Sequence, residues 1–156
     1  MMIGHLMSTC VVTASPMQSL KSAAKIMEEN DFDALPICDN HRVIGMLTVR
    51  DIAMKAVAQG VSLAESKISE FMTFETAYVF MDQPAEEVAR FMIEQQVRRL
   101  LVLDRDYQLV GIVSVDDLLM AGNLQAILAS HVEATKHLEA YQWPNLSFTS
   151  RKQPLH

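Results

Sequence analysis

The sequence predicts an α+β fold built from two copies of one β-α-β-β-α unit. Three observations support this prediction. The chain repeats itself at an offset of 65 positions. Short apolar, β-branched runs alternate with stretches in which apolar residues recur at helical spacing. Each copy also ends its strand hairpin with the same string of residue types, which leads directly into a helix.

The repeat can be followed residue by residue. At an offset of 65 the matching positions include Met7/Met72, Ala24/Ala89, Met27/Met92, Leu35/Leu100 and Asp39/Asp104. One residue is inserted in the turn after Asp104, so the offset becomes 66, and the matches continue as Gly45/Gly111, Thr48/Ser114, Val49/Val115 and Asp51/Asp117. A surface turn tolerates such an insertion well. The chain is therefore an internal duplication.

The same elements are expected in both copies. In the first copy they are a strand at 10–13, a helix that includes Leu20, Ala23, Ala24 and Met27, strands at 34–38 and 42–49 joined by a tight turn, and a helix at 51–58 that stops at Gly60. In the second they are a strand at 76–80, a helix at 84–96, strands at 100–103 and 108–115, and a final helix from Asp116 to about Tyr141.

These elements divide the chain into four parts. We expect a first repeat at 1–60, a linker at 61–71, a second repeat at 72–133 and a C-terminal extension at 134–156. One copy of about 60 residues buries too little apolar surface to be stable alone. Two copies packed sheet against sheet solve that problem, which explains why the unit occurs as a pair.

Composition limits the possible functions. Half of the residues are hydrophobic and 21% are charged, as in a folded globular protein. The formal charge of −6 disfavours non-specific binding to nucleic acid or to anionic membranes. No apolar run approaches the length of a membrane span. Two cysteines form no disulfide framework, so we expect a cytoplasmic protein.

The string that ends each hairpin carries the chemistry. It reads glycine, two apolar residues, a hydroxyl residue, two further residues and aspartate, at 45–51 and again at 111–117. Thr48 and Ser114 fall where a strand becomes a helix, so their hydroxyls can cap the helix or help to hold an anion. Asp51 and Asp117 fall in the first helical turn, where a carboxylate completes a capping box or accepts hydrogen bonds from a ribose diol. Both interpretations stay open at this point.

The two strings, the openings Met7-Ser8 and Met72-Thr73, and the run Ala34-Leu35-Pro36-Ile37 resemble the CBS-domain family, named after cystathionine β-synthase. The resemblance covers roughly residues 3–122. It implies two CBS-type repeats packed about a pseudo-twofold axis, with clefts that bind AMP, ADP, ATP or S-adenosylmethionine. It implies a regulatory, energy-sensing module with such a ligand as its signal, and with no required cofactor.

The resemblance also assigns roles to residues. Thr48 and Ser114 would contact phosphate or ribose, and Asp51 and Asp117 would hold the ribose hydroxyls. The remaining expected ligand-binding residues line the clefts or approach the adenine: Asp33, Ala34, Arg98, Arg99, Ser8 and Thr73. Arg50 is expected to favour a phosphate in the first copy, whereas the second copy has Asp116 at that position. The two sites should therefore differ.

Catalytic and metal sites are not expected. The chain has no Gly-x-Ser-x-Gly elbow and no glycine-rich phosphate loop. Cys38 and His41 have a spacing that zinc ligands use, but a structural zinc site needs about four ligands and the second copy keeps neither residue. Asp116 and Asp117 are adjacent, so on a helix they diverge and cannot act as a catalytic dyad.

The expected partners are a small adenosyl ligand, a second copy of the chain and a separate effector protein. The helix faces expected to need cover in a homodimer hold Ile52, Ala53, Ala56 and Val57 in one copy and Leu118, Leu119 and Ala121 in the other. A different hypothesis is a dimerisation scaffold that binds no nucleotide, in which Asp51 and Asp117 are only helix caps.

Overall fold

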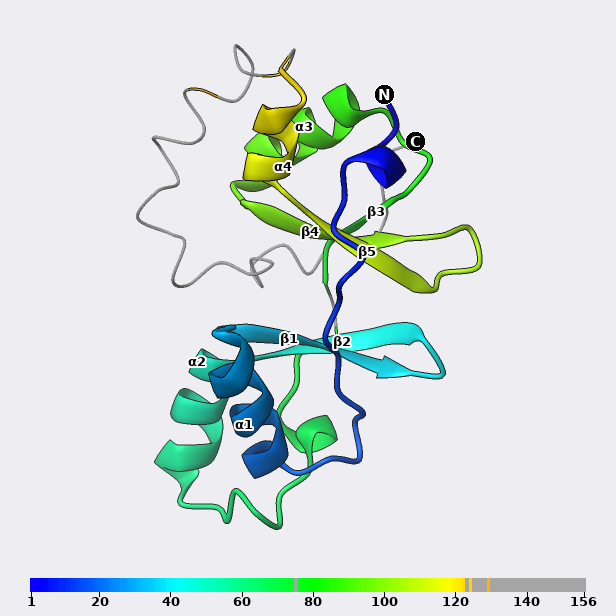
Figure 1. Ribbon diagram of the computed structural model, residues 1–156. Coiled ribbons are helices and arrows are strands. Elements are labelled where there is room, and N and C mark those ends of the chain that lie inside the picture. The colour runs from blue at the N-terminus through cyan, green and yellow to red at the C-terminus, as the bar shows by residue number, and fades with distance from the viewer. Residues whose placement is uncertain (75, 123, 125–128, 130–156) are drawn as a thin grey trace. The chain divides into compact units, whose positions relative to one another are not determined.

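The computed structural model describes residues 1–74, 76–122, 124 and 129 (Figure 1). These residues form a mixed α+β fold with small sheets, as the sequence predicts. They divide into two compact units. The first unit holds residues 12–74, and the second holds Met1–Val11 together with the described residues from Thr76 onward.

The first unit is built around a hairpin of β1 (Ala34–Asp39) and β2 (Arg42–Thr48). Its other elements are α1 (Leu20–Asn30), α2 (Val49–Asp51), the π-helical η2 (Ile52–Val57) and the 3-10 helix η3 (Ile68–Glu70). The helices pack on one face of the hairpin (Figure 1). Their contact buries an apolar core that includes Leu20, Leu35, Ile37, Leu47 and Ile68.

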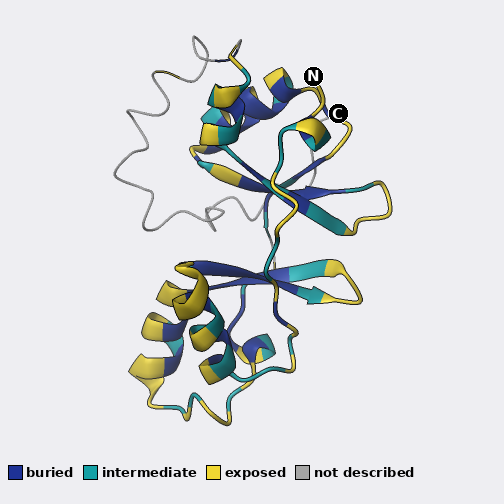
Figure 2. Cartoon of the chain, viewed as in Figure 1, coloured by how far each residue is buried: buried dark blue, intermediate teal, exposed yellow. Residues whose placement is uncertain are grey.

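The second unit repeats this plan. It contains the 3-10 helix η1 (Ile3–His5), β3 (Tyr78–Phe80), α3 (Ala85–Gln95), β4 (Arg99–Leu103), β5 (Leu109–Ser114) and α4 (Val115–Met120). The strands form a sheet in the order β3-β4-β5. The core includes Met92, Leu100, Val102, Val113 and Leu118. Figure 2 shows β4 buried beyond its first residue, while α3 exposes one side.

The first unit lacks one expected strand. A strand is expected at 10–13, but none forms there, and only an isolated bridge joins the following residue, Ala14, to Ile37 of β1. The Ala14 N–H donates to the Pro36 carbonyl, and the Cys38 N–H donates to the Ala14 carbonyl. The next parallel bonds on either side would need N–H groups from Pro16 and Pro36, which proline lacks. The expectation of three full strands in each copy is therefore wrong for the first.

The second copy confirms this explanation. Leu101 stands where the first copy has Pro36, and Met81 stands where it has Pro16. The Met81 N–H donates to the Leu103 carbonyl at 2.9 Å. Here β3 pairs in parallel with β4 over three residues, in the register Tyr78–Leu101, Val79–Val102 and Phe80–Leu103.

The two copies exchange their opening segments. The first segment of the chain belongs to the second unit, where Ile3 is fully buried and Ser8 bridges to Ile112 of β5. In the same way, Thr73 opens the second copy but bridges to Met46 of β2 in the first unit. Each unit therefore combines residues from both sequence repeats.

The final helix is shorter than expected. Helix α4 ends at Met120, because Gly122 adopts a φ of 80°, outside the helical range. An unbroken helix from Asp116 to Tyr141 is therefore wrong, and the expected part from residue 130 onward lies outside the described residues. In the part of the chain that the structure describes, no helix is long and apolar enough to cross a membrane.

Candidate functional site

The first hydroxyl–acid pair closes a capping box at the junction of β2 and α2. The Asp51 N–H donates to Thr48 Oγ1 at 3.0 Å, and the Thr48 N–H donates to Asp51 Oδ2 at 3.0 Å. Both residues are buried, with 9% of Thr48 and 4% of Asp51 exposed. The spacing of three residues thus produces the reciprocal capping geometry that the sequence allowed.

The second pair has the same geometry at the junction of β5 and α4. The Asp117 N–H donates to Ser114 Oγ at 3.1 Å, and the Ser114 N–H donates to Asp117 Oδ2 at 2.8 Å. A further contact joins Ser114 Oγ to Asp117 Oδ2 at 2.9 Å. Both residues are only half-buried, unlike their counterparts in the first unit.

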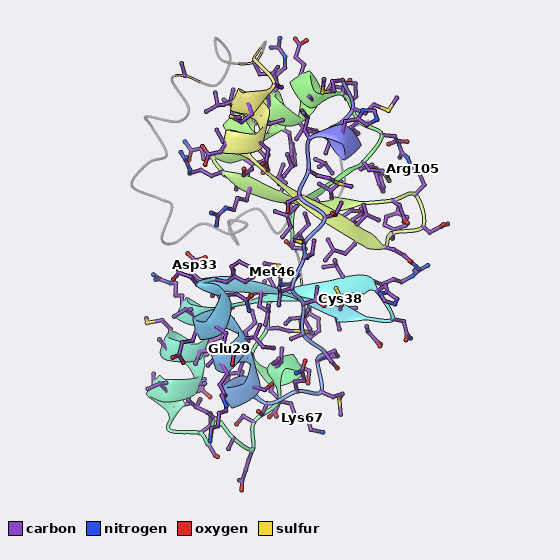
Figure 3. The ribbon with its side chains drawn as sticks, viewed as in Figure 1. Glu29, Asp33, Cys38, Met46, Lys67 and Arg105 are labelled. Atoms are coloured by element: carbon purple, nitrogen blue, oxygen red, sulfur yellow. The ribbon has the colours of Figure 1, made fainter. Side chains whose placement is uncertain are left out.

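The residues expected beside these pairs lie next to them in both units. The Asp33 carbonyl accepts a hydrogen bond from the Val49 N–H at 2.9 Å, and the Arg98 carbonyl accepts one from the Val115 N–H at 2.8 Å. These matching bonds tie the start of each second helix to the start of a central strand. Figure 3 labels Asp33 beside the start of β1.

Strand pairing brings two more expected residues to the same place. Ala34 is the register partner of Thr48 across the first hairpin, and Arg99 is the register partner of Ser114 across the second. Ala34 is buried and Arg99 is exposed. The two equivalent positions therefore differ in both size and charge.

The openings of the two copies approach these strings through exchange. Thr73 and Met46 bond each other by main-chain N–H and carbonyl groups, both at 2.9 Å. Ser8 and Ile112 do the same at 2.8 and 2.9 Å. The expected residues Thr73 and Ser8 thus lie beside the strands that lead to Thr48 and Ser114, respectively. The sequence repeat alone did not reveal that each comes from the opposite copy.

The charges at the two junctions are arranged in opposite ways. In the first unit the acid Asp33 precedes β1, and the base Arg50, which is exposed, lies in α2. In the second unit the base Arg98 stands at the position of Asp33, and the acid Asp116 stands at that of Arg50. Arg98 Nη2 lies 4.0 Å from Asp116 Oδ1. The Arg98 side chain is 12% exposed, whereas that of Asp116 is 77% exposed. The expected difference between the two sites thus has a physical basis in the side chains present.

Sequence reasoning missed one residue at the first junction. Lys55 Nζ lies 3.0 Å from Asp51 Oδ1, and it is also 3.5 Å from the Phe71 carbonyl oxygen. The signal was available, because an acid and a lysine four residues apart on a helix are neighbours. Lys55 lies in η2, and π-helical turns are frequent at functional sites.

The part of the chain that the structure describes contains no cluster of three or more His, Cys, Asp or Glu side chains that could hold a metal ion. Cys38 is partly buried on β1, where burial raises the pKa of its thiol to about 11, and Figure 3 shows its position. His41 is exposed in the turn that follows and has a φ of 67°.

The apolar helix faces expected at a dimer contact are only partly available. Ile52 and Ala56 are buried in the core of the first unit, and Leu118 is buried in that of the second. Exposed apolar side chains do lie nearby on the same helices. They are Val49 and Met54 in the first unit, beside the expected and exposed Val57, and Met120, which is 88% exposed, in the second.

Comparison with known proteins supports the resemblance drawn from the motifs. The CBS domain family model matches residues 3–57 and again residues 68–123. The CBS domain-containing protein YhcV of Bacillus subtilis is 37% identical over 112 residues, which are 72% of this chain and 79% of that protein. The two matched stretches contain both hydroxyl–acid pairs.

Two solved structures are similar in fold and in sequence. Hypoxic Response Protein I, crystallised with two coordinated zinc ions, has a TM-score of 0.65 and 35% identity, covering 80% of this chain and 99% of that chain. The CBS domain pair of protein MJ0100, crystallised with methylthioadenosine and S-adenosylmethionine, has a TM-score of 0.62 and 31% identity. That comparison covers 79% of this chain and all of the other.

Proposed function

This chain belongs to the CBS-domain family, and from that premise we propose that it is a regulatory module that binds an adenosine-containing ligand. The observation that supports this most is that both hydroxyl–acid pairs are present with matched geometry. A similar CBS pair, that of MJ0100, was crystallised with two adenosyl compounds. AMP, ADP, ATP and S-adenosylmethionine are the ligands to test first.

The proposed contacts follow the two junctions. Thr48 and Ser114 would contact ribose or phosphate, and an aspartate of the same string, Asp51 or Asp117, would face the ribose hydroxyls. The surrounding residues that would line the site are Asp33, Ala34, Arg98, Arg99, Ser8, Thr73 and Arg50. A carboxylate that accepts hydrogen bonds from a diol selects ribose over deoxyribose, because loss of a hydroxyl leaves the acceptor without its partner.

The proposed mechanism is a shift in population. A ligand that contacts both repeats favours one mutual arrangement by the difference in its affinity for the available arrangements. A separate effector protein would read this change. We further propose a homodimer that uses the exposed residues Val49, Met54, Val57 and Met120, and a cytoplasmic location, which suits the free thiols of Cys10 and Cys38.

Isothermal titration calorimetry tests the ligand proposal directly. Nucleotide-free protein is titrated with AMP, ADP, ATP, S-adenosylmethionine and NAD, with IMP as a control that lacks the adenine amino group. Saturable binding of an adenosyl compound that IMP does not reproduce is the expected result. No heat with any compound would contradict the proposal.

A dimerisation scaffold that binds no nucleotide is the second candidate. The observation that favours it is the Asp51 carboxylate, both of whose oxygens already have partners inside the protein. In that case Asp51 and Asp117 serve only as helix caps. Sedimentation velocity would then report a stable dimer, while the calorimetric titrations stay silent.

A further inference from the structure

The two aspartates are equivalent in sequence, but their carboxylates are not equally available. We propose that Asp117 is the acceptor of a ribose diol and that Lys55 withholds Asp51 from this role. This proposal rests on the proposed function, and it specifies that the site at Asp117, not the one at Asp51, takes an uncharged nucleoside. It follows from a count of the hydrogen bonds that each carboxylate oxygen already accepts.

In the first unit both oxygens of Asp51 are engaged. Oδ2 accepts the Thr48 N–H, and Oδ1 contacts the Lys55 ammonium group at 3.0 Å. The Asp51 side chain is only 5% exposed. A ribose hydroxyl that approached Oδ1 would have to displace or share a cation that is itself held near the Phe71 carbonyl. An ammonium ion is a stronger partner for a carboxylate than a neutral hydroxyl.

In the second unit one oxygen of Asp117 is open. Oδ2 accepts from both the N–H and the Oγ of Ser114. Among the described residues, no hydrogen bond or ion pair reaches Oδ1. A carboxylate oxygen accepts about two hydrogen bonds, so Oδ1 has capacity for both hydroxyls of a vicinal diol. Asp117 is also half-exposed, so a ligand can reach it.

The difference has one source in the sequence. The position equivalent to Lys55 is Ala121, which has no cation to offer. Helix α4 has no basic residue in its last turn. The nearby guanidinium of Arg98 is paired with Asp116 rather than with Asp117. Exchanging the residues at positions 55 and 121 should therefore leave the Asp51 carboxylate available to a ribose diol and the Asp117 carboxylate occupied.

Calorimetry with adenosine and 2′-deoxyadenosine tests this, because the two probes differ only in one hydroxyl of the diol. Wild-type protein is expected to bind one adenosine per chain, with deoxyadenosine weaker on the order of 10- to 100-fold. Ala121→Lys should reduce adenosine affinity by about 10-fold or more and remove most of the preference over deoxyadenosine. Lys55→Met should add a second adenosine site. Lys25→Met, which removes an exposed lysine from α1, is the matched control and should match wild type.

The outcomes separate this inference from the proposed function. If Ala121→Lys alters the fold, Asp117→Asn replaces it, since the amide oxygen still accepts the capping bond. The inference is overturned if Asp51→Asn removes the preference for adenosine while Asp117→Asn keeps it, or if Lys55→Met leaves the stoichiometry unchanged. Absence of binding by wild type and every variant, to adenosine and to the nucleotide panel, overturns the proposed function itself.

Discussion

The carbonyl oxygen of Thr73 lies 2.5 Å from the point that a β-carbon on Gly45 would occupy. The two residues come from different sequence repeats, yet they lie side by side in one compact unit. The same relationship occurs in the second unit, where a β-carbon on Gly111 would lie 2.8 Å from the Ser8 carbonyl oxygen. Glycine at these two positions thus allows the exchanged segment to reach the strand.

Replacing Gly45 by alanine should destabilise the first unit. The new methyl group would meet backbone, which cannot move aside as a flexible side chain does, so we expect a loss of about 1–3 kcal/mol in the free energy of unfolding. Urea denaturation followed by circular dichroism measures this. Gly60→Asn is the control, because Gly60 has a φ of 71°, which asparagine tolerates, and open space around it. An unchanged midpoint for Gly45→Ala would contradict the contact.

Removing the Thr48 hydroxyl should also lower stability. Thr48→Val keeps the shape but leaves the Asp51 N–H without its acceptor, at a cost of about 0.5–2 kcal/mol. Thr48→Ser keeps the hydroxyl and should recover most of that loss. If Thr48→Val kept the wild-type unfolding midpoint while Thr48→Ser lowered it, packing of the methyl group rather than capping would explain the residue.

The pKa of Asp82 should depend on Arg105. A bidentate pair joins the guanidinium to Asp82 at 2.8 and 2.9 Å, and Arg105 also stacks over the Phe80 ring at 4.1 Å. The hydrogen bond from Arg105 lowers the Asp82 pKa below its ordinary value of 3.8. Figure 3 shows Arg105 at the β4–β5 hairpin. Arg105→Gln should raise the Asp82 pKa toward 3.8, which NMR titration of the carboxyl carbon would detect.

The sign of the linked effect on stability follows. A carboxyl whose pKa is lower in the folded state stabilises the fold above its unfolded pKa, and this contribution disappears as the pH falls through the folded value. The stability difference between wild type and Arg105→Gln should therefore be constant near neutral pH and shrink below about pH 3.8. A difference that grows on acidification would contradict the pairing.

The two cysteines should react at different rates. Burial raises the Cys38 pKa to about 11, so at pH 8 roughly one Cys38 in a thousand is a thiolate, the reactive form. Cys10 is exposed. Alkylation with iodoacetamide at pH 8, followed by mass spectrometry, should modify Cys10 first. The single variants Cys10→Ser and Cys38→Ser assign the two rates, and equal rates would contradict the burial of Cys38.

Much of the fold was predictable because the signals were local. The hairpin strand expected at 42–49 is β2 (Arg42–Thr48), and the helix expected at 84–96 is α3 (Ala85–Gln95). The missing first strand was harder to foresee. Pro36 is acceptable on an edge strand and Pro16 in a turn, and only the parallel register reveals that they remove bonds on both sides of Ala14.

The candidate site shows the same division. Spacing within one string correctly predicts that Thr48 and Ser114 contact the acids three residues later. Position along the chain did not predict that Ser8 lies beside Ile112 or Thr73 beside Met46, since those contacts join segments more than 20 residues apart. Lys55 was within reach of sequence reasoning, because its contact with Asp51 depends only on helical spacing.

The exchange of opening segments makes each repeat depend on the other for completion. A fragment that ended in the linker would carry Ile3 without the core that buries it, and would lack the Ile68–Thr73 stretch that completes its own hairpin. This fragment and the complementary fragment that holds the second repeat, produced together, should associate and complete each other's cores. A lone repeat would have to borrow the segment from a second molecule. Duplication within one chain replaces that encounter by a tethered one, at a high effective concentration.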